Sequence, residues 1–348
     1  MRAIFAGLLA LMLAAQADAA PARVGEMATI EALLGWVSAY RQQPTPTDVP
    51  VAMQRLSKLG AFSPPERASV YVGFLAGVIA ANPERAEELL ARTMPVAAAD
   101  RWIILRAIAY SGLPDWPVLM RRFALRIPRY DVLSDKYIGG KLATLAQYTV
   151  PPTPSGFERM RAKLHLDTMF GGAPRKLTLA PSAEVLDVLW GYYFATGSYG
   201  PVLDIVDMLP LADDHDDAER LTVGSMAKYS LANNALRDPN LLAMLKMTRK
   251  AHGEPKETVK ALDEVIDAAE TVDTARVRAQ ALAAIEELRA KGPAYKRAAS
   301  WWSFVGQSAI AGGCLAAAAL GQVELGLPCV VGGASASAGM NLIANSPD

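Results

Sequence analysis

The segment whose residue types are best suited to bind a ligand is the acidic run Asp213-Asp214-His215-Asp216-Asp217. Carboxylates and an imidazole are ligands for divalent cations, so these five residues are weak candidates for a metal site. The calcium-loop pattern is missing, however, because no Gly stands at the sixth position and no Glu follows at the required distance. The run also precedes a predicted helix, where carboxylates cap free N–H groups and complement the positive end of the helix dipole. We therefore predict capping and no metal.

Other motifs that would fix a mechanism are missing from the sequence. It contains no phosphate-binding loop, dinucleotide-binding glycine pattern, His-Glu-x-x-His or Gly-x-Ser-x-Gly. Three histidines, His165, His215 and His252, are too few for chemistry built on several imidazoles. A Ser-His-Asp triad stays open, because its members need only meet in space. The sequence thus predicts no evident catalytic site and no cofactor.

An aromatic cluster offers a candidate partner-binding groove, with Trp190, Tyr193 and Tyr199 as its lining. Aromatic residues at helical spacing more often pack between helices than line a groove. We favour packing and keep the groove as the alternative.

One stretch is locally basic, with Arg121 and Arg122 followed by Arg126 and Arg129. Cations near the C-terminus of a helix are favoured by its dipole. A solvated helix end is therefore the preferred interpretation.

Helices must position all of these side chains, because helical periodicity runs through the chain and alternating strand-like runs are almost absent. Ser63-Pro64-Pro65-Glu66 has the pattern of a capping box and predicts a helix to about Ala81. Asn82-Pro83 should break this helix, and residues 84–93 form the next one. These two helices form a predicted hairpin.

The same hairpin pattern recurs along the chain. Residues 101–110 and 115–126 form one predicted pair, and residues 217–235 pair with a helix that starts at Asp238-Pro239. Residues 256–290 are strongly helical, and a break at residues 271–274 is left open. We therefore expect an all-α fold of stacked antiparallel helical hairpins, similar to an α-solenoid, with contacts mostly between sequence neighbours.

One hairpin resembles a known repeat family. It covers residues 183–210 and has the spacing of a tetratricopeptide repeat at Leu189, Tyr193, Gly197, Tyr199, Val202 and Val206. The family prefers Ala near the position of Val202, and the other hairpins match only in length. The resemblance implies a scaffold that binds peptides or protein surfaces in a concave groove.

The domain organisation follows from a proline-rich segment at residues 149–156, which cannot continue a helix. We place a linker there, between an N-terminal hairpin domain at residues 20–148 and a tetratricopeptide-like domain at residues 157–297. An apolar Gly/Ala-rich hairpin follows at residues 298–348.

The first 19 residues have the features of a signal peptide. Arg2 precedes an uncharged apolar run at residues 4–15, and Ala17-Asp18-Ala19 matches the cleavage pattern. The apolar run is well below the roughly 20 residues needed to span a membrane. We predict cleavage before Ala20 and export to the periplasm.

The C-terminal hairpin carries the only two cysteines, Cys314 and Cys329, which we expect to form a disulfide in an oxidising compartment. Glu324 is the only charged residue in residues 298–347, so this segment must be buried somewhere. Its many small residues favour close packing inside the protein. Burial in a membrane is the alternative.

Charge limits the class of partner, because 35 basic residues balance 35 acidic ones. Such neutrality argues against nucleic acid as the main partner. The leading hypothesis is an exported helical-repeat scaffold with a protein partner. The alternatives are a membrane-associated protein anchored by residues 298–347, and an all-α enzyme with a dispersed site.

Overall fold

The computed structural model describes residues 24–152, 177–214, 217–251, 253, 255–280 and 283. Within these ranges the chain is helical and has no β-strand, apart from an isolated bridge between Tyr148 and Leu179. The all-α prediction is confirmed there. The α-helices include α2 (Ile30–Ala39), α3 (Val49–Lys58), α4 (Ser69–Ala81), α5 (Ala86–Thr93), α6 (Trp102–Tyr110), α7 (Trp116–Ala124), α8 (Asp131–Ile138), α11 (Ala183–Thr196), α12 (Gly200–Val206), α13 (Ala218–Arg237), α14 (Pro239–Lys250) and α15 (Lys256–Glu270).

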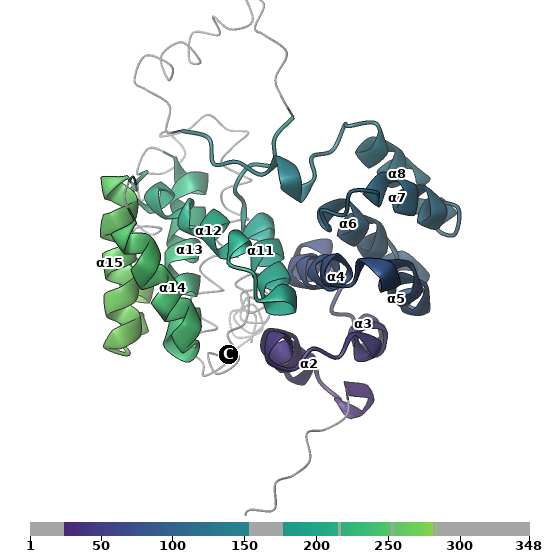
Figure 1. The fold of residues 1–348 in the computed structure, drawn as a ribbon, viewed down its shortest axis with the longest axis horizontal. Coiled ribbons are helices and arrows are strands. Elements are labelled where there is room, and N and C mark those ends of the chain that lie inside the picture. The colour runs from purple at the N-terminus through teal and green to yellow at the C-terminus, as the bar shows by residue number, and fades with distance from the viewer. Residues whose placement is uncertain are drawn as a thin grey trace, which may run out of the picture.

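The centre of the fold is the contact between α4 and α11, which lie side by side in Figure 1. A Cβ atom on Gly73 of α4 would lie 1.9 Å from the carbonyl oxygen of Val188. A Cβ atom on Gly191 of α11 would lie 2.0 Å from the carbonyl oxygen of Val70. The two backbones are therefore almost in contact, which only glycine at these two positions permits.

This contact joins the two halves of the chain in one core. α6 packs on α4, and α12 packs on α11, so the buried residues of both halves form one continuous hydrophobic cluster. The proline-rich segment lies between these halves in sequence, and a domain boundary there gains no support from the packing. The expectation of contacts mostly between sequence neighbours also misses the α4–α11 contact, because it is made by helices distant in the chain.

Several predicted helix ends are confirmed. α4 ends at Ala81, just before Asn82-Pro83. The Asp238 side chain accepts hydrogen bonds from the backbone N–H groups of Asn240 and Leu241 at the start of α14. The sequence left open whether a break at residues 271–274 divides the last predicted helix; α15 ends at Glu270 and helix resumes at residues 274–280, so the helix is interrupted there.

The predicted capping box at Ser63 is wrong. Pro64 has extended backbone angles, and Pro65 begins a 3-10 helix, Pro65–Ala68, that precedes α4. This arrangement leaves Ser63 outside the first turn, and no side chain caps the 3-10 helix. The α-helix itself begins at Ser69.

The segment that resembles a tetratricopeptide repeat forms two helices, α11 and α12, which contact each other. Gly197 ends α11 with a left-handed backbone (φ 66°), and its N–H donates to the Tyr193 carbonyl. The turn therefore depends on a glycine at this position.

Some predicted features lie outside the described residues. They are the signal peptide at residues 1–19 and the apolar hairpin at residues 298–348 with Cys314 and Cys329. In the part of the chain that the structure describes, no helix is both long and apolar enough to cross a membrane.

Candidate functional site

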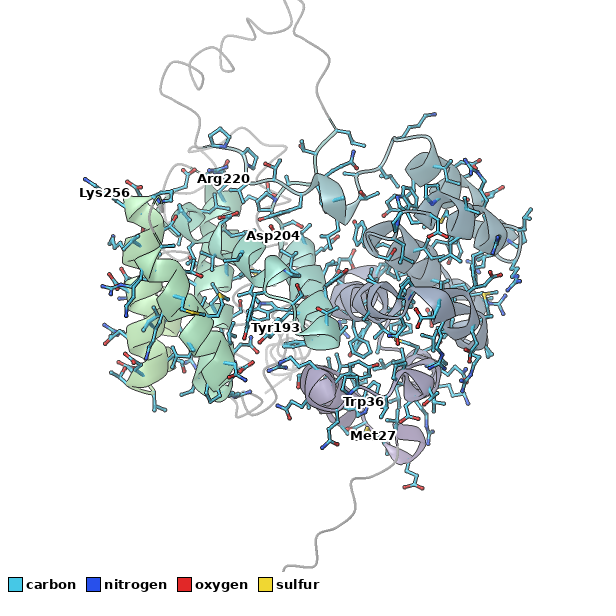
Figure 2. The ribbon with its side chains drawn as sticks, in the orientation of Figure 1. Met27, Trp36, Tyr193, Asp204, Arg220 and Lys256 are labelled. Carbon is cyan, nitrogen blue, oxygen red and sulfur yellow. The ribbon has the colours of Figure 1, made fainter. Side chains whose placement is uncertain are left out.

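A pocket of about 520 Å³ lies where α12 and the 3-10 helix η9 (Leu209–Asp213) meet α13 and the start of α15. The extended segment at residues 148–152 forms another wall. Figure 2 labels two residues of this pocket, Asp204 and Arg220, on the same side of the fold. The charged side chains in the lining are Asp204, Asp207, Arg220 and Glu257. We call this cavity the acidic pocket.

Backbone hydrogen bonds hold the extended wall in place. The Thr149 N–H donates to the Leu179 carbonyl at 3.1 Å, and the Leu179 N–H donates to the Gln147 carbonyl at 2.9 Å. The hydroxyl of Tyr148 donates to the backbone carbonyl of Asp204 at 3.0 Å. Because Pro151 and Pro152 cannot continue a helix, the segment stays extended across the pocket.

Two carboxylates of the pocket come from one turn of helix. Asp204 is half-buried on α12, and Asp207 is exposed at the C-cap of the same helix. Burial, together with the charge of Asp207, raises the pKa of Asp204 to about 6. The negative charge of Asp204 therefore lacks full compensation in the structure.

The one arginine in the lining is already engaged. Arg220 donates from Nε to Asp214 Oδ2 at 2.8 Å and from a terminal nitrogen to the Pro151 carbonyl at 3.0 Å. Asp214 thus balances the charge of Arg220, and Arg220 also ties the extended wall to α13. The remaining charges of the lining, Asp204, Asp207 and Glu257, are all negative.

The predicted acidic run is divided among separate roles. Asp217 caps α13, since its Oδ1 accepts from the N–H groups of Glu219 and Arg220 at 3.0 and 3.3 Å. This confirms capping for Asp217. Asp214 pairs with Arg220, and exposed Asp213 lies 3.6 Å from Lys260.

The other two members of the run, His215 and Asp216, lie outside the described residues. Within the residues that the structure does describe, no group of three or more His, Cys, Asp or Glu side chains is arranged to hold a metal ion.

The candidate partner groove is not open at its aromatic residues. Trp190 and Tyr193 are only 1% and 2% exposed, and Tyr199 alone reaches the surface. Trp190 Nε1 donates to Ser230 Oγ at 3.0 Å, and Tyr199 stacks on Tyr193 with ring centroids 6.3 Å apart. Trp190 and Tyr193 therefore pack in the core, because they face α13 and the N-terminal helices rather than solvent.

Tyr193 belongs to a polar cluster that links α11 to the segment after α2 and to the start of α14. Its hydroxyl donates to Asp238 Oδ2 at 2.7 Å, and Arg41 donates to the same oxygen at 2.6 Å. The guanidinium of Arg41 also lies 4.9 Å from the centre of the Tyr193 ring. Burial by itself would raise the pKa of Asp238, but the hydrogen bonds from Tyr193 and Arg41 outweigh it and lower the pKa.

Sequence reasoning missed the acidic pocket. One signal was present, because Asp204 and Asp207 are spaced to share a face of the predicted helix. The partners of that face come from residues 148–152 and from the first turn of α15, which are remote in sequence.

The residues that the structure describes thus form an all-helical fold with one hydrophobic core and an acidic pocket on its surface. The chain matches no protein-family model, and no curated protein or solved structure is significantly similar to it.

Proposed function

We propose that this chain is an exported helical interaction protein that binds a positively charged group of a protein partner in the acidic pocket. The observation that carries the proposal is the charge of the pocket lining. Asp204, Asp207 and Glu257 line the cavity, so the lining contains three carboxylates and a single arginine, Arg220, which forms an ion pair with Asp214. A lysine side chain, an arginine side chain or an amino terminus has the complementary charge.

Physical chemistry supports a cationic ligand. The raised pKa of Asp204 means that its charged form is poorly stabilised in the free protein. A cation in the pocket would supply the missing compensation, and the partly buried position makes this interaction stronger than one in bulk water. Asp204 also lies on α12, the second helix of the unit that resembles a tetratricopeptide repeat. Export and repeat-family membership are parts of this proposal.

A second candidate function is acid–base catalysis in the same pocket. It is favoured by the pKa of about 6 at Asp204 beside the exposed carboxylate Asp207, since pairs of carboxylates in different environments can act as acid and base. The two candidates differ in the fate of the bound molecule. A binding partner would be recovered chemically unchanged, whereas a substrate would be recovered as product. In the second case Asp204→Asn should leave the substrate unconverted. Membrane anchoring by residues 298–347 concerns residues outside the described ranges and stays a prediction.

Site-specific photo-crosslinking tests the binding proposal in cells that export the full-length chain. The crosslinking residue replaces Thr149, which is exposed and lines the pocket, or Met247, which is 65% exposed on α14. We expect a defined protein adduct from position 149 and not from position 247. The adducted peptide should contain a lysine, an arginine or the partner's amino terminus, as mass spectrometry would show.

Charge removal then tests the role of the carboxylates. Asp204→Asn/Asp207→Asn should reduce the adduct at position 149 by about tenfold, since a charged hydrogen bond contributes about 1.5 kcal/mol or more. The matched control is Glu66→Gln/Glu84→Gln, which removes two exposed carboxylates elsewhere. An adduct that survives the first variant, or that is lost equally in the control, would contradict the proposal.

A further inference from the structure

The C-terminal part of α7 has an unusual surface, which differs from the acidic pocket in charge and in position. Residues 116–130 contain four arginines and no carboxylate. Val118, Arg121, Arg122 and Leu125 follow one another at helical spacing and are all exposed. Because this spacing places them on one face, α7 presents cations and apolar side chains together. We call this face, with Arg126 and Arg129, the α7 surface.

Its apolar members are truly open to solvent. Leu125 is 86% exposed and Val118 is 46% exposed, although both belong to residue types that are usually buried. Figure 1 places α7 and α8 at one end of the long axis of the fold, away from α15. Within the described residues, therefore, no other element covers these side chains.

The cations of this surface exceed the carboxylates near them. Arg122 and Arg126 share a single partner, Glu87, at 2.6 and 3.7 Å. In the part of the chain that the structure describes, Arg121 and Arg129 have no carboxylate within ion-pair distance. The surface therefore carries unbalanced positive charge, which lies beside exposed Leu125.

A second basic helix, α14, differs from α7 in how two of its cations are paired. α14 also has an exposed apolar residue, Met247, between the cations Lys246 and Arg249. Those cations are matched one to one by carboxylates of α15, with Lys246 2.5 Å from Glu270 and Arg249 2.5 Å from Asp263. An anionic partner has no free cation to bind at those two positions.

We propose that the α7 surface docks peripherally on a membrane that carries anionic lipid headgroups. Arginine guanidinium groups bind lipid phosphates through paired hydrogen bonds, and each cation near the surface adds to the attraction. Leu125 and Val118 enter the boundary between headgroups and acyl chains, where apolar side chains are stabilised. A nucleic acid would match the arginines but would give Leu125 no apolar environment. This inference does not depend on the function of the acidic pocket.

Vesicle co-sedimentation of the purified full-length protein tests the proposal. The probes are phosphatidylcholine vesicles with and without phosphatidylglycerol, at low and high salt. We expect binding to the vesicles that contain phosphatidylglycerol, weak binding to phosphatidylcholine alone, and loss of binding as salt rises, because screening weakens surface electrostatics.

Two variants address the two kinds of side chain. Arg121→Gln/Arg129→Gln should lower the partition coefficient about fivefold for each arginine. Leu125→Ser should lower it severalfold by removing apolar insertion. Both variants should keep the melting temperature of the parent, because all three side chains are exposed. The control, Lys246→Gln/Met247→Ser on α14, should bind vesicles as the parent does.

Three results would overturn the proposal. The first is equal binding to neutral and anionic vesicles. The second is that both α7 variants bind vesicles as strongly as the parent, which would assign membrane attachment to residues 298–347 instead. The third is binding of duplex DNA that is lost in Arg121→Gln/Arg129→Gln and unchanged in Leu125→Ser. That result would identify a site for polyanions with no contact to lipid. Asp204→Asn/Asp207→Asn should leave vesicle binding unchanged, so failure here is distinguishable from failure of the pocket proposal.

Discussion

The close contact between α4 and α11 makes Gly73→Ala the most informative test of the fold. A methyl group at this position would lie 1.9 Å from the Val188 carbonyl oxygen, far inside the 3.4 Å at which ordinary contact begins. The obstacle is backbone, so no side chain can rotate away. The helices must separate, and every apolar contact along both of them is then weakened.

The expected cost follows from two opposing contributions. Overpacking a core usually costs about 1 to 3 kcal/mol, and a clash with backbone belongs at or above the upper end of that range. Replacing glycine by alanine inside a helix returns about 1 kcal/mol through helix propensity. We therefore expect Gly73→Ala to lower the free energy of unfolding by at least about 2 kcal/mol. The melting temperature should fall by about 4 °C or more.

The assay is thermal or urea unfolding followed by circular dichroism, with Gly200→Ala as the matched control. A Cβ atom on Gly200 would have its nearest contact at 3.8 Å, so this variant should be neutral or slightly stabilising. Gly191→Ala should resemble Gly73→Ala, and the double variant should cost less than the sum, because the first substitution already separates the helices. A Gly73→Ala protein as stable as the control would refute the packing described for α4 and α11.

Other predictions concern the polar groups. Arg41→Ala should cost about 2 kcal/mol at neutral pH, because it leaves the largely buried Asp238 without its cation. The pKa of Asp238 is lowered in the folded state, so the stability that its charged form contributes is present above the unfolded-state pKa and is lost as pH falls through the folded-state pKa. The unfolding curves of the parent and of Arg41→Ala should therefore converge in acid. The effect of pH on stability is opposite for Asp204, because its pKa is raised to about 6 and its charged form destabilises the fold. Asp204→Asn should therefore stabilise the fold by about 1 kcal/mol above that pH and have no effect in acid. Urea unfolding at several pH values measures this difference. Ser230→Ala should cost about 1 to 3 kcal/mol in thermal unfolding by leaving the buried Trp190 N–H without its acceptor.

The local features of the fold could be predicted from the sequence because they depend on neighbouring residues. Asn82-Pro83 ends α4 and Asp238-Pro239 starts α14, since proline restricts the backbone beside it and Asp accepts from free N–H groups. The left-handed turn at Gly197 is likewise a local property. Ser63 shows the limit of this reasoning, because its pattern fitted a cap while the backbone of Pro64 places it outside the helix.

Features that join distant parts of the chain could not be predicted in the same way. A glycine at position 73 can be read in the sequence, but nothing nearby identifies Gly191 as the facing residue. The partnership of Arg41 with Asp238 depends on the same pairing of remote helices. The acidic pocket is lined by residues 148–152, by α12 with η9, by α13 and by the start of α15, so the sequence alone shows its carboxylates only as ordinary surface charges.

The α4–α11 contact also decides how the two proposed surfaces can work together. The acidic pocket is built on α12, which follows α11 directly, whereas the α7 surface is connected to α4 through α6. In Figure 1 α7 and α12 lie on opposite sides of the central helices, so occupation of one surface leaves the other open. A chain that docks on a membrane through α7 would therefore still present its acidic pocket to a partner. Since the central backbones are nearly in contact, little movement is available to couple the two surfaces. Their effects on binding should be additive when the variants are combined.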